Sequence, residues 1–428
     1  MPRVHPSQIL VVRLGAIGDV LLATPLVRAL RRAHPDARLL FLTKREHADL
    51  LRGNPHVDEV LEWPEARAEP DGGRGAEPGP GADAAPAARS PGALRPRRTA
   101  PWSRPARALA LRVRRGGPLW LVDLQASPRT LAFAFLLGPQ RRFVWRKPYL
   151  RRQLLVSFRI DRYPKPPPSV AERYFDAVRA PGLTPDGGGL DLRPGDEAER
   201  AAREVLEEAG RELGASRWIA VAPGARWATK RWPPESFAAA ARELAAGGGT
   251  GAAPGAARPG PAEGEAARSE TPPNGPARRG VVVLGSGEDR PAAGVVADLL
   301  RSSRTPVLDL AGRLPLLASA AVLGRCEGIL TNDSGLLHVA AALRVPAVAL
   351  FGSTVPQLGF GPYRSPARVL GVEGLPCRPC THVGRPACPL GHFRCMRGIR
   401  PEAAVRAAGE LLAGGGRVRR GGGAGVVR

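Results

Sequence analysis

Residues 328–353, GILTNDSGLLHVAAALRVPAVALFGS, combine two apolar strand patterns with a polar turn and an apolar helix pattern. The apolar residues before Thr331 predict one buried strand, and residues 345–351 predict another. A strand, a helix and a second strand in this order are typical of a βαβ unit with parallel strands. The stretch therefore predicts an α/β fold built on parallel sheets.

The polar turn of this stretch has the composition of an anion-binding site. Asp333, Ser334 and Gly335 stand between strand and helix, and His338 follows Ser334 by one helical turn. The free N–H groups and the positive dipole end of a helix attract phosphate, and small residues let it approach. The alternative is a simple helix cap at Asp333 or Ser334, with His338 a surface or core histidine.

Composition indicates a two-domain protein with an anionic partner. A chain of 428 residues, 43% hydrophobic and 24% charged, is long enough for two cores. The apolar start at residues 9–12 is interrupted by Arg13 and Asp19, which predicts a strand rather than a signal peptide, so we expect a cytoplasmic protein. The formal net charge of +24 favours nucleic acid, a membrane surface or a phosphorylated substrate as partner.

The chain divides into two α/β blocks once two segments rich in Gly, Pro, Ala and Arg are set aside. Residues 65–105 and 247–279 lack a hydrophobic period and are predicted to be disordered insertions. Alternating strands and helices in the rest predict two doubly wound domains facing a central cleft. The predicted division is residues 1–180 for the first domain, 181–214 for a hinge and connecting helix, 215–414 for the second domain, and 415–428 for a disordered tail. The expected strands are residues 9–12, 38–42, 119–123, 218–222, 281–284, 307–310, 328–331 and 347–351, and one helix is expected over residues 20–33.

A second glycine-rich turn, GAIGD, follows the first predicted strand. It matches neither GxGxxG nor the P-loop pattern, so no dinucleotide fingerprint is supported. It places the carboxylate of Asp19 at the start of a helix, where the dipole favours the ionised form. The alternative is again a helix cap beside a tight turn.

Two further predicted strand ends carry charged side chains. Lys230 follows the PGAR turn, and a flexible point charge suits a departing phosphate. Only four of the 63 basic residues are lysine, so this one stands out from the arginine bias. Glu288 follows the strand before GSGEDR, where an acid could accept hydrogen bonds from ribose hydroxyls. A solvated cation and a helix cap are the respective alternatives.

Five segments in chain order resemble glycosyltransferase family 9, the ADP-heptose:lipopolysaccharide heptosyltransferases, and most of all the heptosyltransferase II type. They are VRLGAIGDVLLATPLVRAL, VDLQASPRT, VAPGARWATKRWPPESFA, LGSGEDR and TNDSGLLHVAAALRVPAVALFGST. The resemblance implies a GT-B fold of two Rossmann-like domains, the first binding the acceptor and the second the nucleotide sugar. It also implies transfer of heptose from ADP-heptose to the Kdo-lipid A region of lipopolysaccharide, by a peripheral enzyme at the cytoplasmic leaflet of the inner membrane.

The resemblance assigns roles to individual positions. It implies that Asp19 is the catalytic base and that the donor is bound by Lys230, Glu288, Asp333, Ser334, Gly335 and His338. It implies acceptor-side positions at Arg13, Gly18, Gln125 and Arg129. An inverting transfer is a single displacement that needs one base and a stabilised leaving group. Because the sequence contains no DxD pair to bridge a metal to the diphosphate, we expect catalysis without a metal cofactor.

The segment 141–152 mixes cations with aromatic residues, which suits a phosphorylated glycolipid at an anionic leaflet. The alternative is a solvated basic face inflated by the arginine bias. Four cysteines, Cys377, Cys380, Cys388 and Cys395, begin with a CxxC pair and suggest a structural zinc, with a loop of reduced thiols as the alternative.

Two rival functions remain at this point. One is a zinc-containing nucleic-acid-binding protein, which explains neither the charged strand ends nor the two α/β blocks, so no nucleic acid is expected as a partner. The other is a member of the same family with a different nucleotide sugar or acceptor.

Overall fold

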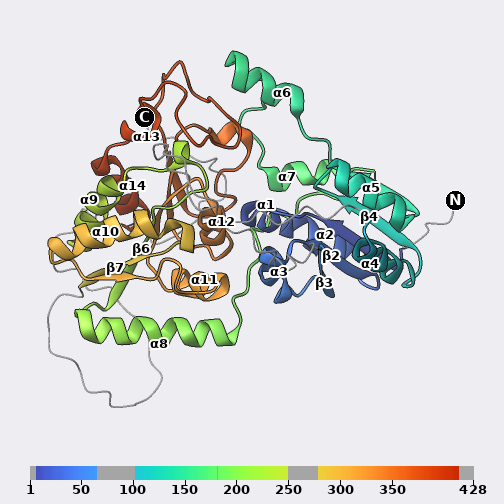
Figure 1. The fold of residues 1–428 in the computed structure, drawn as a ribbon, viewed down its shortest axis with the longest axis horizontal. Helices are drawn as coiled ribbons and strands as arrows, with labels where there is room; N and C mark the ends of the chain where they lie inside the picture. Colours follow the sequence, from blue (N-terminus) through green and yellow to red (C-terminus); the bar gives the residue numbers. More distant parts are fainter. Residues whose placement is uncertain (1–5, 65–101, 181, 249–277, 414–428) are drawn as a thin grey trace, which may run out of the picture.

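The computed structural model describes residues 6–64, 102–180, 182–248 and 278–413. Within them the chain forms two α/β domains side by side, each built on one parallel sheet (Figure 1). This confirms the doubly wound fold expected from the sequence. The two predicted insertions and the tail lie almost wholly outside the described residues.

The first domain is a five-stranded sheet in the order β3-β2-β1-β4-β5. Its strands are β1 (Gln8–Val12), β2 (Arg38–Thr43), β3 (Glu59–Glu62), β4 (Leu119–Asp123) and β5 (Arg141–Val144), and its helices are α1 (Ile17–Leu21), α2 (Thr24–Ala33), α3 (Arg45–Arg52), α4 (Arg104–Arg114) and α5 (Pro128–Leu137). Alternate residues of β1 enter two cores: Ile9 and Val11 pack in one, and Leu10 and Val12 pack in the other. Both faces of the sheet are therefore covered, as the continuous apolar run of β1 predicts.

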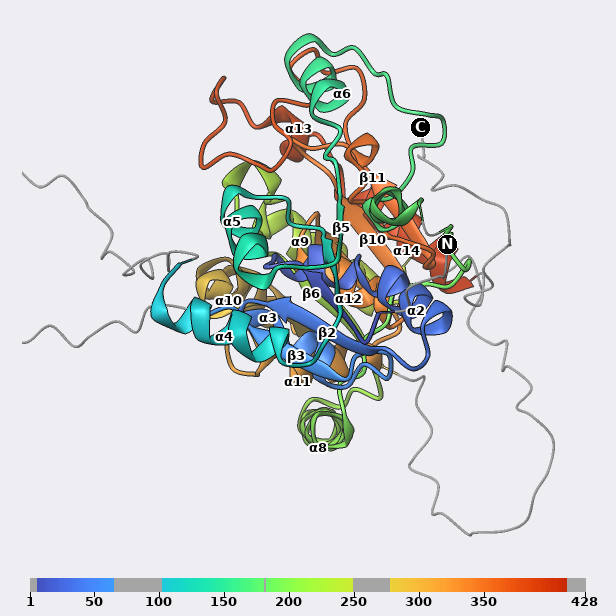
Figure 2. The same ribbon diagram turned by 90° about the vertical axis from the view of Figure 1, so that its right-hand side faces the viewer.

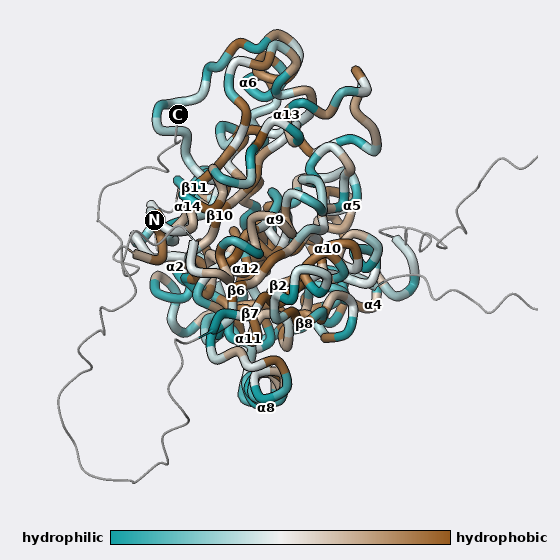
Figure 3. The backbone as a smooth tube through the Cα atoms, turned by 90° about the vertical axis from the view of Figure 1, so that its left-hand side faces the viewer, coloured by the Kyte–Doolittle hydropathy of each residue, from teal (hydrophilic) through white to brown (hydrophobic). Residues whose placement is uncertain are grey.

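The second domain is a six-stranded sheet in the order β11-β10-β9-β6-β7-β8. Its strands are β6 (Arg217–Ala222), β7 (Arg279–Val283), β8 (Val307–Asp309), β9 (Ile329–Asn332), β10 (Ala347–Leu350) and β11 (Ala367–Leu370). Its helices are α8 (Asp196–Leu213), α9 (Pro234–Ala245), α10 (Arg290–Ser302), α11 (Leu316–Gly324), α12 (Gly335–Ala342), α13 (Arg394–Arg397) and α14 (Pro401–Ala413). The short 3₁₀ turns η3 (Ala228–Lys230), η4 (Gly287–Asp289) and η5 (Pro356–Leu358) follow strand ends of this sheet. Figure 3 shows apolar strands in its interior and a largely hydrophilic α8 outside.

The excursion between the two sheets contains four short helical elements. They are α6 (Tyr149–Gln153), the π-helix η1 (Leu154–Phe158), α7 (Val170–Arg173) and the 3₁₀-helix η2 (Tyr174–Val178). The η2 helix packs on β4 and β5. The excursion also reaches the second domain, because the Arg173 guanidinium donates to the carbonyl oxygens of Leu358 and Gln357, both at 2.9 Å.

Both sheets reverse strand order at a point that positions the candidate site. In the first sheet the reversal lies between β1 and β4, and in the second it lies between β6 and β9. Ligands of open parallel sheets bind beyond the carboxyl ends of the strands at such switch points. Asp19 and Gln125 follow β1 and β4, and Lys230 and Asp333 follow β6 and β9.

The eight expected strands are present within two residues of their predicted ends, whereas β3, β5 and β11 were not predicted. The helix expected over residues 20–33 was wrong, because the chain forms α1 and α2 instead. Pro25 has no N–H to bond the carbonyl of Leu21, and the Thr24 hydroxyl donates to that oxygen at 2.7 Å. The predicted end of the first insertion was also slightly late, since α4 begins at Arg104.

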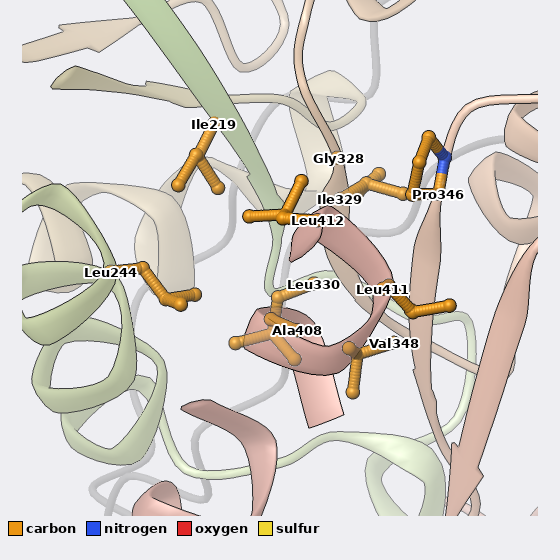
Figure 4. Close-up of a pocket in the computed structure, with 10 residues that line it drawn as sticks. All are labelled: Ile219, Leu244, Gly328, Ile329, Leu330, Pro346, Val348, Ala408, Leu411 and Leu412. Atoms are coloured by element: carbon orange, nitrogen blue, oxygen red, sulfur yellow. The ribbon is translucent and has the colours of Figure 1, made fainter. Parts of the chain in front are cut away.

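A cavity of about 10 Å³ lies beneath α14 and is lined by apolar side chains, among them Leu330 and Val348 (Figure 4). It is too small and too apolar to hold a nucleotide sugar. In the described part of the chain, none of the helices has the length and apolar character needed to cross a membrane.

Candidate functional site

The two domains meet where α1 crosses α12, directly at the two predicted turns. Glycine makes this contact possible: a Cβ added to Gly18 would lie 2.3 Å from Cδ2 of His338. On the other side of the crossing, a Cβ added to Gly335 would lie 3.2 Å from Ile17. Gly18, expected on the acceptor side, and His338, expected on the donor side, are therefore packed against each other.

Three donors hold the Asp19 carboxylate. The Arg13 guanidinium lies 2.6 Å from Oδ1, and the Tyr174 hydroxyl donates to the same oxygen at 3.4 Å. The backbone N–H of Ala16 donates to Oδ2 at 3.1 Å. Burial raises the pKa of Tyr174, so its hydroxyl remains a donor at any physiological pH. The carboxylate has a defined orientation at the domain interface, where the side chain is 16% exposed.

Lys230 ends η3, which follows β6, and Asp333 directly follows β9; the two residues form an ion pair beyond the second switch point. The ammonium lies 2.6 Å from Oδ2 of Asp333, and the side chains are 14% and 7% exposed. Asp333 also accepts a 2.7 Å hydrogen bond from the Thr354 hydroxyl. The structure therefore joins two residues that the sequence placed in the donor site separately.

His338 is buried between the charged groups of both domains. Burial lowers the pKa of its imidazole, Asp333 and Asp19 oppose this shift, and Lys230 adds to it. The neutral ring is favoured, and its Nδ1 has no hydrogen-bond partner among the described residues. Asp19, Lys230, Asp333 and His338 thus form one cluster, which we call the cleft cluster.

The remaining predicted site residues lie on segments that follow strands β4, β7 and β9. Gln125 accepts a 3.2 Å hydrogen bond from the backbone N–H of Leu14, in the strand end before the GAIGD turn. Ser334 is the residue that precedes α12, and Glu288 is exposed in η4 at the end of β7. Arg129 lies over the Trp63 ring, 5.7 Å from its centroid.

Sequence reasoning missed three residues at the site. Tyr174 reaches Asp19 from η2, and nothing in the sequence links these positions. His47 packs against the GAIGD turn, since a Cβ on Gly15 would lie 2.5 Å from its Nε2. Lys147 was assigned only to the basic segment, yet desolvation by the surrounding protein and repulsion by Arg13 lower its pKa. Lysine is rare in this arginine-rich chain, and this rarity singled out Lys230 in the sequence. The same signal could have singled out Lys147.

The four clustered cysteines line a cavity of about 440 Å³, which Thr229, the neighbour of Lys230, also lines. The cavity is lined by Cys377, Cys380, Cys388 and Cys395, by His392, and by residues of η1. All five cysteines are free thiols. Among the described residues, no group of three or more His, Cys, Asp or Glu side chains is arranged to hold a metal ion. The donor set suits zinc in kind, but its geometry here does not form a zinc site.

The model of glycosyltransferase family 9 (heptosyltransferase) matches residues 277–390, which include the Lys230 partner Asp333 and the whole α12 turn. Over this stretch the chain is similar to glycosyltransferase family 9. Among curated members of the family, lipooligosaccharide heptosyltransferase 2 of Campylobacter jejuni is 27% identical over 133 residues, 31% of this chain and 40% of that protein. The sequence match therefore spans about two fifths of the length of this relative.

Solved structures of the family share the fold over almost the full described chain. A family 9 glycosyltransferase from Veillonella parvula superposes with a TM-score of 0.65 at 20% identity, covering 95% of this chain and 98% of that one. The E. coli ADP-heptose LPS heptosyltransferase II superposes with a TM-score of 0.59 at 21% identity, covering 95% and 99%. At these identities the likeness establishes the family's two-domain architecture.

Proposed function

We propose that this protein is an inverting glycosyltransferase that moves heptose from ADP-heptose to the Kdo-lipid A region of the lipopolysaccharide inner core. One observation carries the proposal: a carboxylate on the first domain and a lysine on the second follow strands at the switch points of the two sheets, and the charges of both act on His338 at the domain junction. A base facing a diphosphate-binding cation across a cleft is the arrangement that a single displacement needs.

Asp19 is the base in this proposal. It takes the proton from the acceptor hydroxyl while that oxygen attacks the anomeric carbon of the sugar. Arg13, Tyr174 and the N–H of Ala16 keep the carboxylate in one orientation, which limits the reorganisation needed when the acceptor arrives.

Lys230 and the start of α12 stabilise the departing ADP. Lys230 supplies a positive charge, and the N–H groups at Ser334 and Gly335 face the carboxyl edge of the second sheet. In this scheme the diphosphate competes with Asp333 for the ammonium group. Glu288, at the neighbouring strand end, is proposed to contact the ribose.

The proposal includes catalysis without a metal cofactor, so transfer should persist in EDTA. A structural zinc on the four cysteines is a separate proposal that requires the loop of residues 377–395 to contract. Elemental analysis of the purified protein tests it, and a preparation free of zinc that retains its fold and activity would contradict it.

The decisive experiment measures ADP release from ADP-heptose with two acceptors, Kdo₂-lipid A and its mono-heptosylated form. We expect release with one of them and little with either acceptor alone or the donor alone. Release from a different nucleotide sugar, with none from ADP-heptose, would assign the chain to another donor. Because the acceptor is an amphiphile, we also propose that the enzyme works at the cytoplasmic surface of the inner membrane.

A further inference from the structure

The helix formed by α6 and η1 carries large apolar side chains on its outer surface. Tyr149, Leu150 and Phe158 are 64%, 71% and 67% exposed, although such residues are usually buried. Leu150, Leu154 and Phe158 follow one another at intervals of four residues, which places them along one side of a helix. An exposed apolar stripe of this kind marks an interaction surface.

The opposite side of the same helix is fixed to the body of the protein. Leu155 is 5% exposed and packs with Tyr163, Val355 and Leu358, two of which belong to the second domain. Arg159, just after the helix, donates to the carbonyl oxygens of Pro376 and Cys377 at 3.3 and 3.4 Å. Figures 1 and 2 show that α6 projects at the same end of the molecule as the loop that leads to α13.

Cations surround the apolar stripe. They are Arg146, Lys147, Arg151, Arg152 and Arg162, and Asp161 is the one acid between residues 141 and 165. Within the described ranges none of these five cations forms an ion pair with a carboxylate. Apolar side chains flanked by unpaired cations complement an anionic lipid surface, where the chains insert and the cations meet head groups.

Single-stranded nucleic acid fits this surface less well. It would need exposed aromatic faces on which bases stack. The Tyr149 ring is covered by Arg152, whose guanidinium lies 5.0 Å from its centroid. Phe158 is then the one open aromatic face of residues 149–158, too few for successive bases to stack on, and leucines provide none.

We propose that residues 149–158 are a membrane-docking helix that inserts Leu150 and Phe158 into an anionic bilayer. The inference rests on the proposed function, since it explains how the cleft reaches a lipid-anchored acceptor. Four residues before the helix, the Trp145 ring packs edge-on against Tyr174 at 4.9 Å, and the Tyr174 hydroxyl donates to Asp19. Docking this helix would therefore bring the candidate site close to the bilayer surface.

The test compares vesicle binding by the full-length protein and two variants. In Leu150→Glu/Phe158→Glu both inserting residues carry a charge, and Leu299→Glu is the matched control because Leu299 is also exposed, on α10 of the second domain. With vesicles of phosphatidylethanolamine and phosphatidylglycerol we expect binding about tenfold weaker for the double variant and within about twofold of wild type for the control. Equal binding by all three proteins would overturn the proposal.

Two further measurements separate this proposal from the proposed function. Transfer to a deacylated, water-soluble acceptor should be unchanged in the double variant, whereas transfer to acceptor embedded in vesicles should fall about tenfold. If wild type transfers to neither acceptor, the proposed function fails, and vesicle binding still tests whether residues 149–158 dock on the membrane.

The second measurement is hydrogen exchange in the wild-type protein. Vesicles should slow the exchange of residues 149–158. No slowing, or displacement of the vesicles by single-stranded RNA, would overturn the proposal.

Discussion

Lys230 and Asp333 form an ion pair of 2.6 Å in the candidate donor site, on segments that follow the two strands flanking the switch point of the second sheet. The lysine proposed to meet the donor diphosphate is thus already neutralised by a carboxylate. Binding of ADP-heptose must displace or share this contact, and the Thr354 hydroxyl remains as a second partner for Asp333.

Replacing Lys230 should weaken both donor binding and folding. In Lys230→Met the diphosphate loses its cation and Asp333 is left buried without a counter-charge, which costs on the order of 3 kcal/mol of unfolding free energy. We expect the Kd for ADP to rise about tenfold or more, as measured by calorimetry.

The variant Asp333→Asn keeps the Lys230 ammonium but removes the carboxylate that holds it in place. We therefore expect kcat to fall while the affinity for ADP changes less. Lys44→Met is the control, since Lys44 pairs with Glu46 on the first domain; unchanged ADP binding in Lys230→Met would refute the donor role.

Replacing Asp19 should affect turnover far more than donor binding. A general base contributes about 10²- to 10⁴-fold, so Asp19→Asn should lower kcat by that range and leave the Kd for ADP-heptose within about twofold. Tyr174→Phe removes only the 3.4 Å hydrogen bond to Asp19 and should cost less than about tenfold in kcat. Loss of donor binding with an unchanged kcat would assign Asp19 to a structural role, as a helix-start residue bound to Arg13.

The sequence alone was enough to select those candidate site residues that a local pattern marks. Asp19, Lys230 and Asp333 each follow an apolar strand at a polar turn, and parallel strands bring such turns to one edge. The strands that were missed, β3, β5 and β11, all lie at sheet edges. Edge strands are short and carry charges, as Arg141 and Arg142 do in β5, so the apolar pattern that marks a central strand is weak in them.

Contacts between segments far apart in the chain could not be read from the sequence. Tyr174 contacts Asp19 only because η2 packs on the first sheet after a long excursion, and Gly18 contacts His338 only because the domains close on each other. These depend on tertiary packing, for which a single sequence carries no local signal.

Gly18→Ala should separate the domains at the crossing of α1 and α12. The added methyl group would lie 2.3 Å from His338 Cδ2, so the buried imidazole or one of the two helices must shift. Because the base and the donor lysine are on opposite sides of this crossing, we expect kcat to fall about tenfold or more. Gly294→Ala is the matched control: it lies within α10, a Cβ there meets nothing within 4 Å, and alanine should stabilise the helix slightly. Equal kcat values for the two variants would show that the close contact does not matter for turnover.

Acidification should destabilise the protein through His338. Burial lowers the pKa of its imidazole in the folded state, whereas an unfolded histidine titrates near 6.5. As the pH falls below that value, the unfolded chain takes up a proton that the native state resists, so the unfolding free energy decreases. Protonation in the native state is costly because His338 is 3% exposed and, among the described residues, its Nδ1 has no hydrogen-bond partner. The negative charges of Asp333 and Asp19 favour the protonated imidazole, whereas the positive charge of Lys230 disfavours it.

The measurement is the urea unfolding free energy of wild type and His338→Gln between pH 7.5 and pH 5.5. We expect the wild-type value to decline over this interval and the variant to decline less, since glutamine does not titrate. His47, His56 and His382 also have lowered pKa values and should keep part of the slope in both proteins. Parallel slopes would mean that His338 is not the group that couples folding to pH, and that the imidazole finds an acceptor when it is protonated.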